Sequence, residues 1–313
     1  MSVMLHPNPN LLVRIAMADA YCLACEDCER RVGGKTLRQA LAFEGYLNAS
    51  KRSKHLGRYS DDGEWSAANA RVLLNGRFEP IDFANAIVEE FQRGKQRKGY
   101  ARRLYRILKS VENGTEFLER VHANSNRNGA AMRAVPIGVL PRVCDVLDVA
   151  TTQAKITHDT FEGRFSARAV ALMSHFALYE EEPLHQLAAY CVTHLPEVDL
   201  RLFGHVFKKS WTYGLPVIYS RCPSMAVGTV HAALTAVMTQ SSLIDILKWI
   251  LETGGDVDTI AAIAWGIAST RYQDEKLPKF FKRDLENGRE ATGARYLRSL
   301  GEDLMKLYGP SSR

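Results

Sequence analysis

Apolar residues recur every three or four positions along almost the whole chain, which is the spacing that a helix buried on one face requires. Period-two alternation is scarce, and no Asn-Gly turn joins two alternating segments. The pattern therefore predicts an all-α fold. The runs expected to be helical are 11–30, 64–75, 82–93, 101–112, 136–149, 164–178, 184–194, 226–239, 242–252, 258–270 and 291–308.

Gly, Pro, Asn and Asp cluster between these runs, so the chain is expected to turn there. No cluster is long enough or of low enough complexity to be a linker, and no internal repeat is visible. A chain of 313 residues can bury one large core. We therefore predict a single domain over residues 1–313.

The composition, with 46% hydrophobic and 24% charged residues, is that of a globular protein and excludes a disordered one. No run of eighteen apolar residues and no signal-peptide layout is present, so we expect a cytoplasmic protein without a membrane partner. Three of the six cysteines, Cys22, Cys25 and Cys28, have the spacing of a cluster or zinc motif. Because Val32 stands where a fourth ligand would fall, we interpret them as small buried residues.

Residues 93–109 hold eight Lys and Arg and no acid, within a chain of net charge +6. This run suits contact with phosphates, including those of nucleic acid. It also suits a solvated helix face whose apolar side packs inward. The second interpretation is favoured because no nucleic-acid-binding motif accompanies the run, so nucleic acid is a possible but not a favoured partner.

Two short acidic segments each precede a run that is expected to be helical, and they offer only oxygen ligands. Four carboxylates that converge would repel one another unless cations lay between them. Oxygen donors without His or Cys favour Mg²⁺ or Mn²⁺ over zinc. The segments therefore predict a two-metal centre with the ligands Ser60, Asp61, Asp62, Asp256, Asp258 and Thr259.

Two further loops lead into helices and suit a phosphate-bearing substrate. Residues 123–129 are rich in Asn and end in Gly129, and His158 follows the other loop. His158 could donate to a phosphate or a ribose, or bond to a backbone carbonyl. Arg133 lies inside the next helix, where we expect it to bond to a carboxylate or to carbonyls rather than to substrate.

Asp19 and Glu26 are seven residues apart, so they share one face of the first helix. Glu26 is a candidate for a substrate-gating or proton-handling carboxylate. It is equally a candidate for simple exposure, because Asp27 and Glu29 make this end of the helix acidic.

In this order, these segments resemble the ADP-ribosylglycohydrolases over nearly the whole chain. The resemblance implies an all-helical, single-domain orthogonal bundle with a binuclear Mg²⁺ or Mn²⁺ centre. It also implies cleavage of the glycosidic bond between ADP-ribose and an acceptor. The segments that carry it are Ala18-Asp19-Ala20, Ser60-Asp61-Asp62, Asn128-Gly129-Ala130-Ala131-Met132-Arg133, Pro136-Ile137-Gly138 and Gly254-Gly255-Asp256-Val257-Asp258-Thr259.

The resemblance assigns the six oxygen ligands to the metals and the 125–129 loop to the diphosphate and distal ribose. We assign Asp62 or Asp256 to polarising the water, with Glu26 auxiliary. The substrate-binding residues would be Ser125, Asn126, Arg127, Asn128, Gly129 and His158.

The chain departs from the family pattern at several positions. Gly63 stands where the family has a second hydroxyl residue after the aspartates, Cys22 replaces a glycine, and Arg127 replaces the glycine before Asn-Gly. Arg127 could reach the diphosphate or crowd it.

The expected partner is an ADP-ribosylated protein, with arginine as the first expectation for the acceptor, ADP-ribose as product, and the chain as a monomer. Serine, O-acetyl-ADP-ribose or a nucleic-acid base are alternative acceptors. A non-catalytic ADP-ribose-binding protein and a two-metal phosphoesterase are alternative functions.

Overall fold

The computed structural model describes residues 5–25, 35–47, 56–97, 99–210 and 224–310. All regular structure in these ranges is helical, as the sequence predicts, and the nearest approach to a sheet is an isolated bridge between Asn124 and His158. None of the described helices is long and apolar enough to span a membrane. The α-helices are α1 (Leu11–Cys22), α2 (Lys35–Ala42), α3 (Asp61–Asn75), α4 (Pro80–Arg93), α5 (Arg102–Lys109), α6 (Gly114–Arg120), α7 (Gly129–Met132), α8 (Val143–Lys155), α9 (Phe161–Tyr179), α10 (Leu187–His194), α11 (Glu197–Phe203), α12 (Met225–Thr239), α13 (Leu243–Thr253), α14 (Val257–Ala268), α15 (Phe280–Arg283) and α16 (Ala294–Tyr308).

Five short 3₁₀ segments connect or extend these helices. They are η1 (Leu23–Cys25), η2 (Val135–Val139), η3 (Leu184–Gln186), η4 (Gly204–Phe207) and η5 (Leu285–Gly288).

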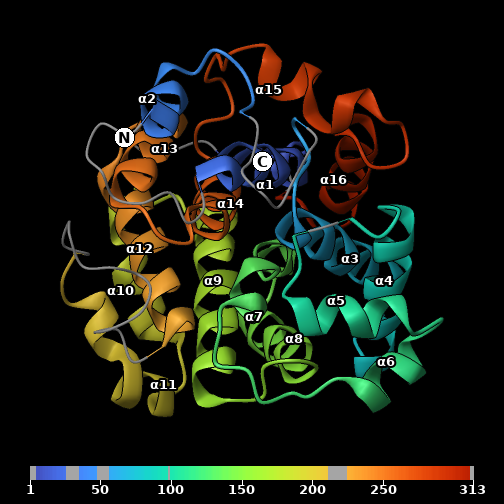
Figure 1. Cartoon of the computed structure of the whole chain (residues 1–313). Coiled ribbons are helices and arrows are strands. Elements are labelled where there is room, and N and C mark those ends of the chain that lie inside the picture. The colour runs from blue at the N-terminus through green and yellow to red at the C-terminus, as the bar shows by residue number, and fades with distance from the viewer. Residues whose placement is uncertain (1–4, 26–34, 48–55, 98, 211–223, 311–313) are drawn as a thin grey trace.

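The centre of the molecule is formed by α1, α9 and α14 (Figure 1). Every residue of α14 is buried, as are most of those in α1 and α9, which explains why these stretches are predominantly apolar. Gly266 allows the close approach, because a Cβ there would lie 2.8 Å from Ile15 Cγ1 of α1 and 2.9 Å from Val135 Cγ1.

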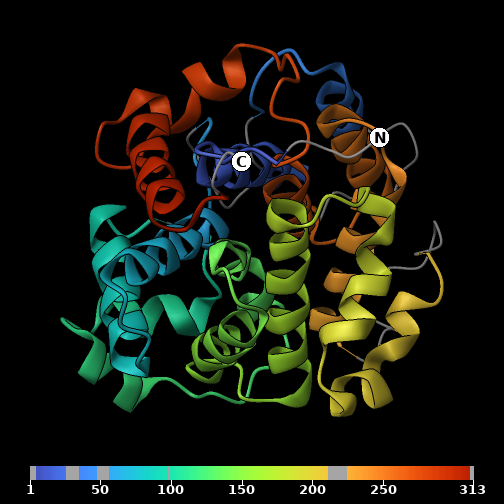
Figure 2. The same ribbon diagram turned by 180° about the vertical axis from the view of Figure 1, so that it is seen from behind.

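Two groups of helices flank this centre. In Figure 1, α10 to α13 lie on one side and α3 to α6 on the other, and Figure 2 shows α9 running between them from behind. Side-chain caps define several helix starts: Ser60, Thr160 and Ser242 each accept a hydrogen bond from a backbone N–H in the first turn. The starts of α3 and α14 lie close together, because Asp62 and Asp258 in their first turns approach within 4.8 Å.

The single helix expected over 136–149 is wrong. The chain instead forms η2, turns through Leu140 to Arg142, and then begins α8. Pro141 accounts for the break, because it lacks an N–H and disfavours helical backbone at the preceding residue, and Leu140 has an extended ψ of 134°.

Candidate metal centre and substrate cavity

A cavity of about 920 Å³ opens between α3, α5, α7 and the start of α14. This volume is within the range of sites for small molecules and cofactors. Five of the six expected metal ligands contribute to its wall or lie against it, together with most of the expected substrate residues. Its polar lining includes Asp61, Asp62, Arg102, Arg103, His122, Asn124, Ser125, Arg127, Asn128, Arg133, Thr157, His158, Asp256, Asp258 and Thr259.

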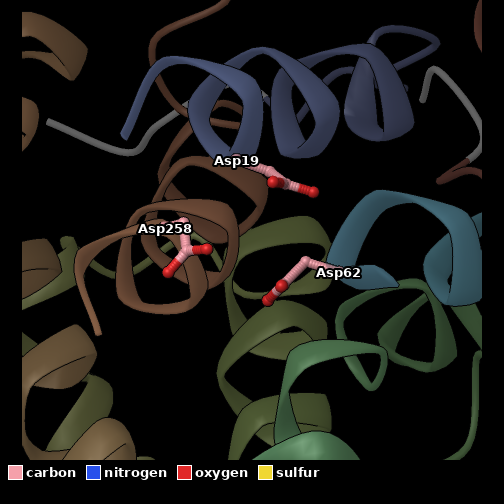
Figure 3. Close-up of side chains that lie close together, drawn as sticks. All are labelled: Asp19, Asp62 and Asp258. Atoms are coloured by element: carbon pink, nitrogen blue, oxygen red, sulfur yellow. The ribbon is translucent and has the colours of Figure 1, made fainter. Parts of the chain in front are cut away.

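Three buried carboxylates from three helices meet at this cavity. Asp19 comes from α1, Asp62 from α3 and Asp258 from α14, and one oxygen of each lies within 4.8 Å of the others (Figure 3). The sequence predicts Asp62 and Asp258 as ligands, whereas it does not assign Asp19 to the metals. Segments far apart in the chain therefore form one acidic cluster.

The surroundings of Asp62 fit a cation. Burial raises the pKa of this carboxyl well above its usual range, and the nearby charges of Asp19, Asp61 and Asp256 raise it further. Its buried Oδ1 has no hydrogen-bond partner within the described residues. A desolvated oxygen among like charges is costly unless a positive charge compensates for it. Together with an oxygen-only donor set, this arrangement fits Mg²⁺ or Mn²⁺.

The start of α3 is held by Ser60 and Asp19. Ser60 Oγ accepts from the Asp62 backbone N–H at 3.3 Å and donates to Asp62 Oδ2 at 2.9 Å. The Asp19 carboxylate accepts from the backbone N–H groups of Ser60 and Gly63, each at 2.9 Å. Asp19 therefore fixes the loop that carries the first aspartate pair, and burial raises the pKa of Asp19 to about 7.

Gly63, one of the departures from the family pattern, has a local steric reason. A Cβ at this position would lie 2.7 Å from Cδ2 of the buried Tyr59 ring. The Tyr59 ring thus occupies the space that a hydroxyl-bearing side chain at residue 63 would need.

The second aspartate pair follows a turn that requires glycine. Gly254 and Gly255 have φ values of 72° and 94°, which residues with a side chain rarely adopt. Asp256 comes next as the residue before α14, and the Asn128 amide donates to its Oδ2 at 2.5 Å. Asn128, expected at the substrate, therefore also orients a candidate metal ligand.

The 125–129 loop contributes unevenly to the cavity. Ser125, Arg127, Asn128 and Gly129 line it, whereas the exposed Asn126 is outside the lining and its carbonyl accepts from Ser224. The Ser125 hydroxyl accepts from the Arg127 N–H at 3.2 Å. Arg127 is exposed, with no ion pair among the described residues. Arg127 is the one charged residue of this loop, and its charge is available to a ligand.

His158 is buried at the cavity wall and is neutral. Burial lowers its pKa to about 3, and the nearby charge of Arg133 adds to the effect. The Thr157 hydroxyl accepts from Arg133 Nη2 at 2.9 Å and lies 2.6 Å from His158 Nδ1. Its own hydrogen is free to be donated to Nδ1, and in that arrangement the imidazole proton is on Nε2, where His158 can donate to a ligand.

Arg133 bonds to backbone carbonyls of this wall, as expected. Its guanidinium donates to the carbonyls of Gly129 at 2.6 Å and Gln153 at 2.9 Å, and it stacks 4.6 Å from the Trp65 ring. The His158 ring packs on Gly129, where a Cβ would lie 2.6 Å from His158 Cε1.

The basic run 93–109 divides between two roles. Arg97 is buried and pairs with Glu64 and Glu286, each at 2.6 Å. Arg102 and Arg103 are exposed on α5, line the cavity and have no ion pair among the described residues. The run is therefore more than a solvated face, because α5 brings positive charge to one wall of the cavity.

Two expectations fall partly or wholly outside the described ranges. Glu26, the candidate auxiliary carboxylate, is not among the described residues, and neither is Cys28. Cys22 and Cys25 are buried, as expected, and burial raises the pKa of the Cys22 thiol well above its usual range.

The role of Asp19 in the cluster is the main feature that reasoning from the sequence missed. A lone acid inside the largely apolar stretch 11–22 was the available signal.

The sequence matches the family description of ADP-ribosylglycohydrolase over residues 14–313. Similar curated proteins include ADP-ribosylhydrolase ARH3 of Xenopus tropicalis, 26% identical over 333 residues, covering 85% of this chain and 90% of that protein. ADP-ribosylhydrolase ARH3 of Homo sapiens is 25% identical over 296 residues, covering 80% of this chain and 81% of that protein.

A solved structure described as an ADP-ribosylglycohydrolase-related protein complex has a similar fold. Its TM-score is 0.69 at 19% sequence identity, and the match covers 96% of this chain and 97% of that chain.

Proposed function

This chain belongs to the ADP-ribosylglycohydrolase family and is a hydrolase of that glycosidase class; from this premise we propose its substrate and metal dependence. With two bound Mg²⁺ or Mn²⁺ ions, it cleaves the bond between ADP-ribose and an arginine side chain of a modified protein. The convergence of Asp19, Asp62 and Asp258 beside the cavity is the observation that carries the proposal.

The proposed ligands are the predicted set, Ser60, Asp61, Asp62, Asp256, Asp258 and Thr259, with Asp19 as a further carboxylate at the cluster. When bound, the ions supply Lewis-acid polarisation of the ribose hydroxyls and of the attacking water. Asp62 or Asp256 orients that water toward the anomeric carbon and accepts its proton.

The 125–129 side of the cavity suits the diphosphate. His158 Nε2–H offers a neutral donor when the Thr157 hydroxyl donates to Nδ1, from which it lies 2.6 Å. Arg127 offers a positive charge at the cavity wall, and the missing side chain of Gly129 allows the His158 ring to lie against this loop. ADP-ribose would then lie with its diphosphate near Arg127 and its distal ribose at the carboxylates.

A cationic arginine acceptor suits the acidic end of the cavity. Asp61 is only half-buried and lines the cavity, so it can attract a guanidinium at the reacting bond. The bond between the anomeric carbon and the arginine nitrogen breaks through an oxocarbenium-like state. The guanidine leaves with the bonding electron pair, and the water adds to the ribose carbon.

Nucleic acid is the second candidate acceptor, and α5 is the observation that favours it. Arg102 and Arg103 line the cavity next to Tyr105 and Ile107, so an acceptor with phosphates and bases would find cations beside apolar surface.

The test is a panel of arginine-, serine- and nucleic-acid-linked ADP-ribose, with O-acetyl-ADP-ribose, incubated with Mg²⁺ or Mn²⁺. We expect the fastest release of intact ADP-ribose from the arginine conjugate. Faster release from the nucleic-acid conjugate would identify nucleic acid as the acceptor and would leave the proposed reaction unchanged. Formation of AMP would identify a phosphoesterase and contradict the proposed chemistry.

A further inference from the structure

A second cavity, of about 590 Å³, is lined by residues of α1, α15, α16 and the segment before α15. Both α15 and α16 pack against α1, and Figure 1 shows where these three helices lie. None of its lining residues lines the catalytic cavity, and none is acidic. Its cationic side chains are Arg14, Lys279, Lys282, Arg283 and Arg298, and its apolar side chains include Val13, Met17, Leu277 and Phe281.

Arg14 is the least compensated of these cations. It is partly buried, and among the described residues its guanidinium has only Met17 Sδ as a hydrogen-bond partner, at 3.8 Å. Burial lowers the pKa of Arg14, whereas the negative charge of Glu275 raises it by a smaller amount. The Glu275 carboxylate is itself engaged, because it accepts from the backbone N–H groups of Leu243 and Ile244 at 2.6 and 3.2 Å. A desolvated guanidinium with a weak partner is a binding group for an anion.

The remaining cations leave further positive charge available. Lys279 and Lys282 are exposed and form no ion pair within the described ranges. Arg298 pairs with Glu302 at 2.8 Å and also donates to Asn10 Oδ1 at 3.0 Å. Two lysines without an ion pair and the weakly partnered Arg14 therefore provide about three positive charges around one cavity, which suits a ligand with several phosphate groups.

The floor of the cavity offers apolar surface to a ligand. This surface comes from Leu277, Pro278 and Ala294, which line the cavity and are partly exposed. Phe281 and Met17 are buried beneath it and support it, and Phe281 stacks against Phe280 with ring centroids 4.4 Å apart. A ligand with a flat ring could cover this floor while its charged groups reach the lysines.

We propose that this cavity is a binding site for a ring-bearing polyphosphate, such as a nucleoside triphosphate, and that it is separate from the catalytic cavity. Arg14 and Asp19 both belong to α1, but five residues at 3.6 per turn place them about 140° apart around the helix. The two cavities therefore use different faces of the same helix.

The test is calorimetric titration of the full chain with ATP and with inorganic tripolyphosphate, in EDTA so that no divalent metal recruits the phosphates. Both should bind, and ATP should bind more tightly because its ring covers the apolar floor. Arg14→Gln and Lys282→Gln should each weaken binding about tenfold, since each removes a charge-assisted contact. Lys282 is exposed, so its variant remains informative if Arg14→Gln does not fold.

Two controls locate the ligand. Lys276→Gln, an exposed lysine outside this lining, should leave ATP binding unchanged, and so should Arg127→Gln at the catalytic cavity. No binding of ATP, or equal binding by wild type and Lys282→Gln, would overturn the proposal. Loss of binding in Arg127→Gln alone would place the ligand in the catalytic cavity and would overturn it equally.

Discussion

Burial and three neighbouring carboxylates act on Asp62 in the same direction, since all of them disfavour its charged form. A side chain in these surroundings destabilises the folded protein unless a cation is present. Asp62 therefore adds no stability of its own in the metal-free protein, which fits the proposed role as a metal ligand.

Asp62→Asn and Asp256→Asn should each abolish turnover while the fold remains intact. The melting temperature of the metal-free variant should equal or exceed that of wild type, because one of the repelling carboxylates is removed. Its affinity for Mg²⁺ or Mn²⁺, measured by calorimetry, should fall. Asp303→Asn, at an exposed position, is the matched control and should change none of these quantities. Full activity in both cluster variants would exclude the metal-hydrolase account.

His158 makes the stability of the fold depend on pH. Its pKa is about 3 in the folded state and near 6.5 when exposed, so between these values only the unfolded chain binds the proton. The free energy of unfolding therefore falls as the pH drops from 6.5 toward 3, by up to about 1.4 kcal/mol per pH unit.

In urea titrations at pH 7 and pH 5, His158→Gln should lose less stability than wild type over this interval. His185→Gln, at an exposed position, should behave as wild type does. An unchanged pH dependence in His158→Gln would mean that His158 is not neutral in the fold.

At the scale of elements, α5 connects the basic run to the catalytic cavity. Leu108 is its one fully buried residue, so the helix contributes little to the core and presents most of its length to solvent or to a ligand. Arg102 and Arg103 face the cavity, whereas Arg106 on the same helix does not line it.

Arg102→Gln and Arg103→Gln should each raise KM several-fold at low salt with kcat nearly unchanged, because they weaken attraction to the phosphates without touching the reacting bond. The difference from wild type should shrink as salt increases. Arg106→Gln is the control, because it removes a positive charge from the same helix at a residue that does not line the cavity. Equal KM values in all three variants would show that α5 does not contact substrate.

The helices that periodicity predicts are those with long apolar stripes, such as α9 and α12. Short elements, including α6 and α11, carry too few turns for a period to be visible in the sequence. The break at Pro141 could be predicted from the proline itself, although the apolar pattern continues across it.

The candidate site was predictable where its residues are close in the chain. The two aspartate pairs each follow a recognisable turn, so their place at helix starts could be inferred. Asp19 could not be assigned to the cluster, because its role depends on which face of α1 meets α3, and packing decides that. The same holds for Asn128, whose contact with Asp256 joins residues 128 positions apart.

At the scale of the whole molecule, the cavity is bounded by helices from both halves of the chain, so a ligand there should stabilise the entire fold. ADP-ribose at 100 times its dissociation constant should add about 2.7 kcal/mol to the free energy of unfolding. The melting temperature should rise by a few degrees with Mg²⁺ present and by less in EDTA. A melting temperature that does not change when millimolar ADP-ribose and Mg²⁺ are added would contradict this substrate class.

The central claim is that the carboxylates of α1, α3 and α14 hold two divalent cations against the distal ribose of ADP-ribose. The most direct test is a crystal grown with Mn²⁺ and ADP-ribose, with the metals located by their anomalous scattering. The account predicts two peaks about 3.5–4 Å apart between Asp62 and Asp258, with the ribose beside them and the diphosphate near His158. Well-ordered ADP-ribose with no metal at these carboxylates, or metal bound elsewhere in the molecule, would contradict it.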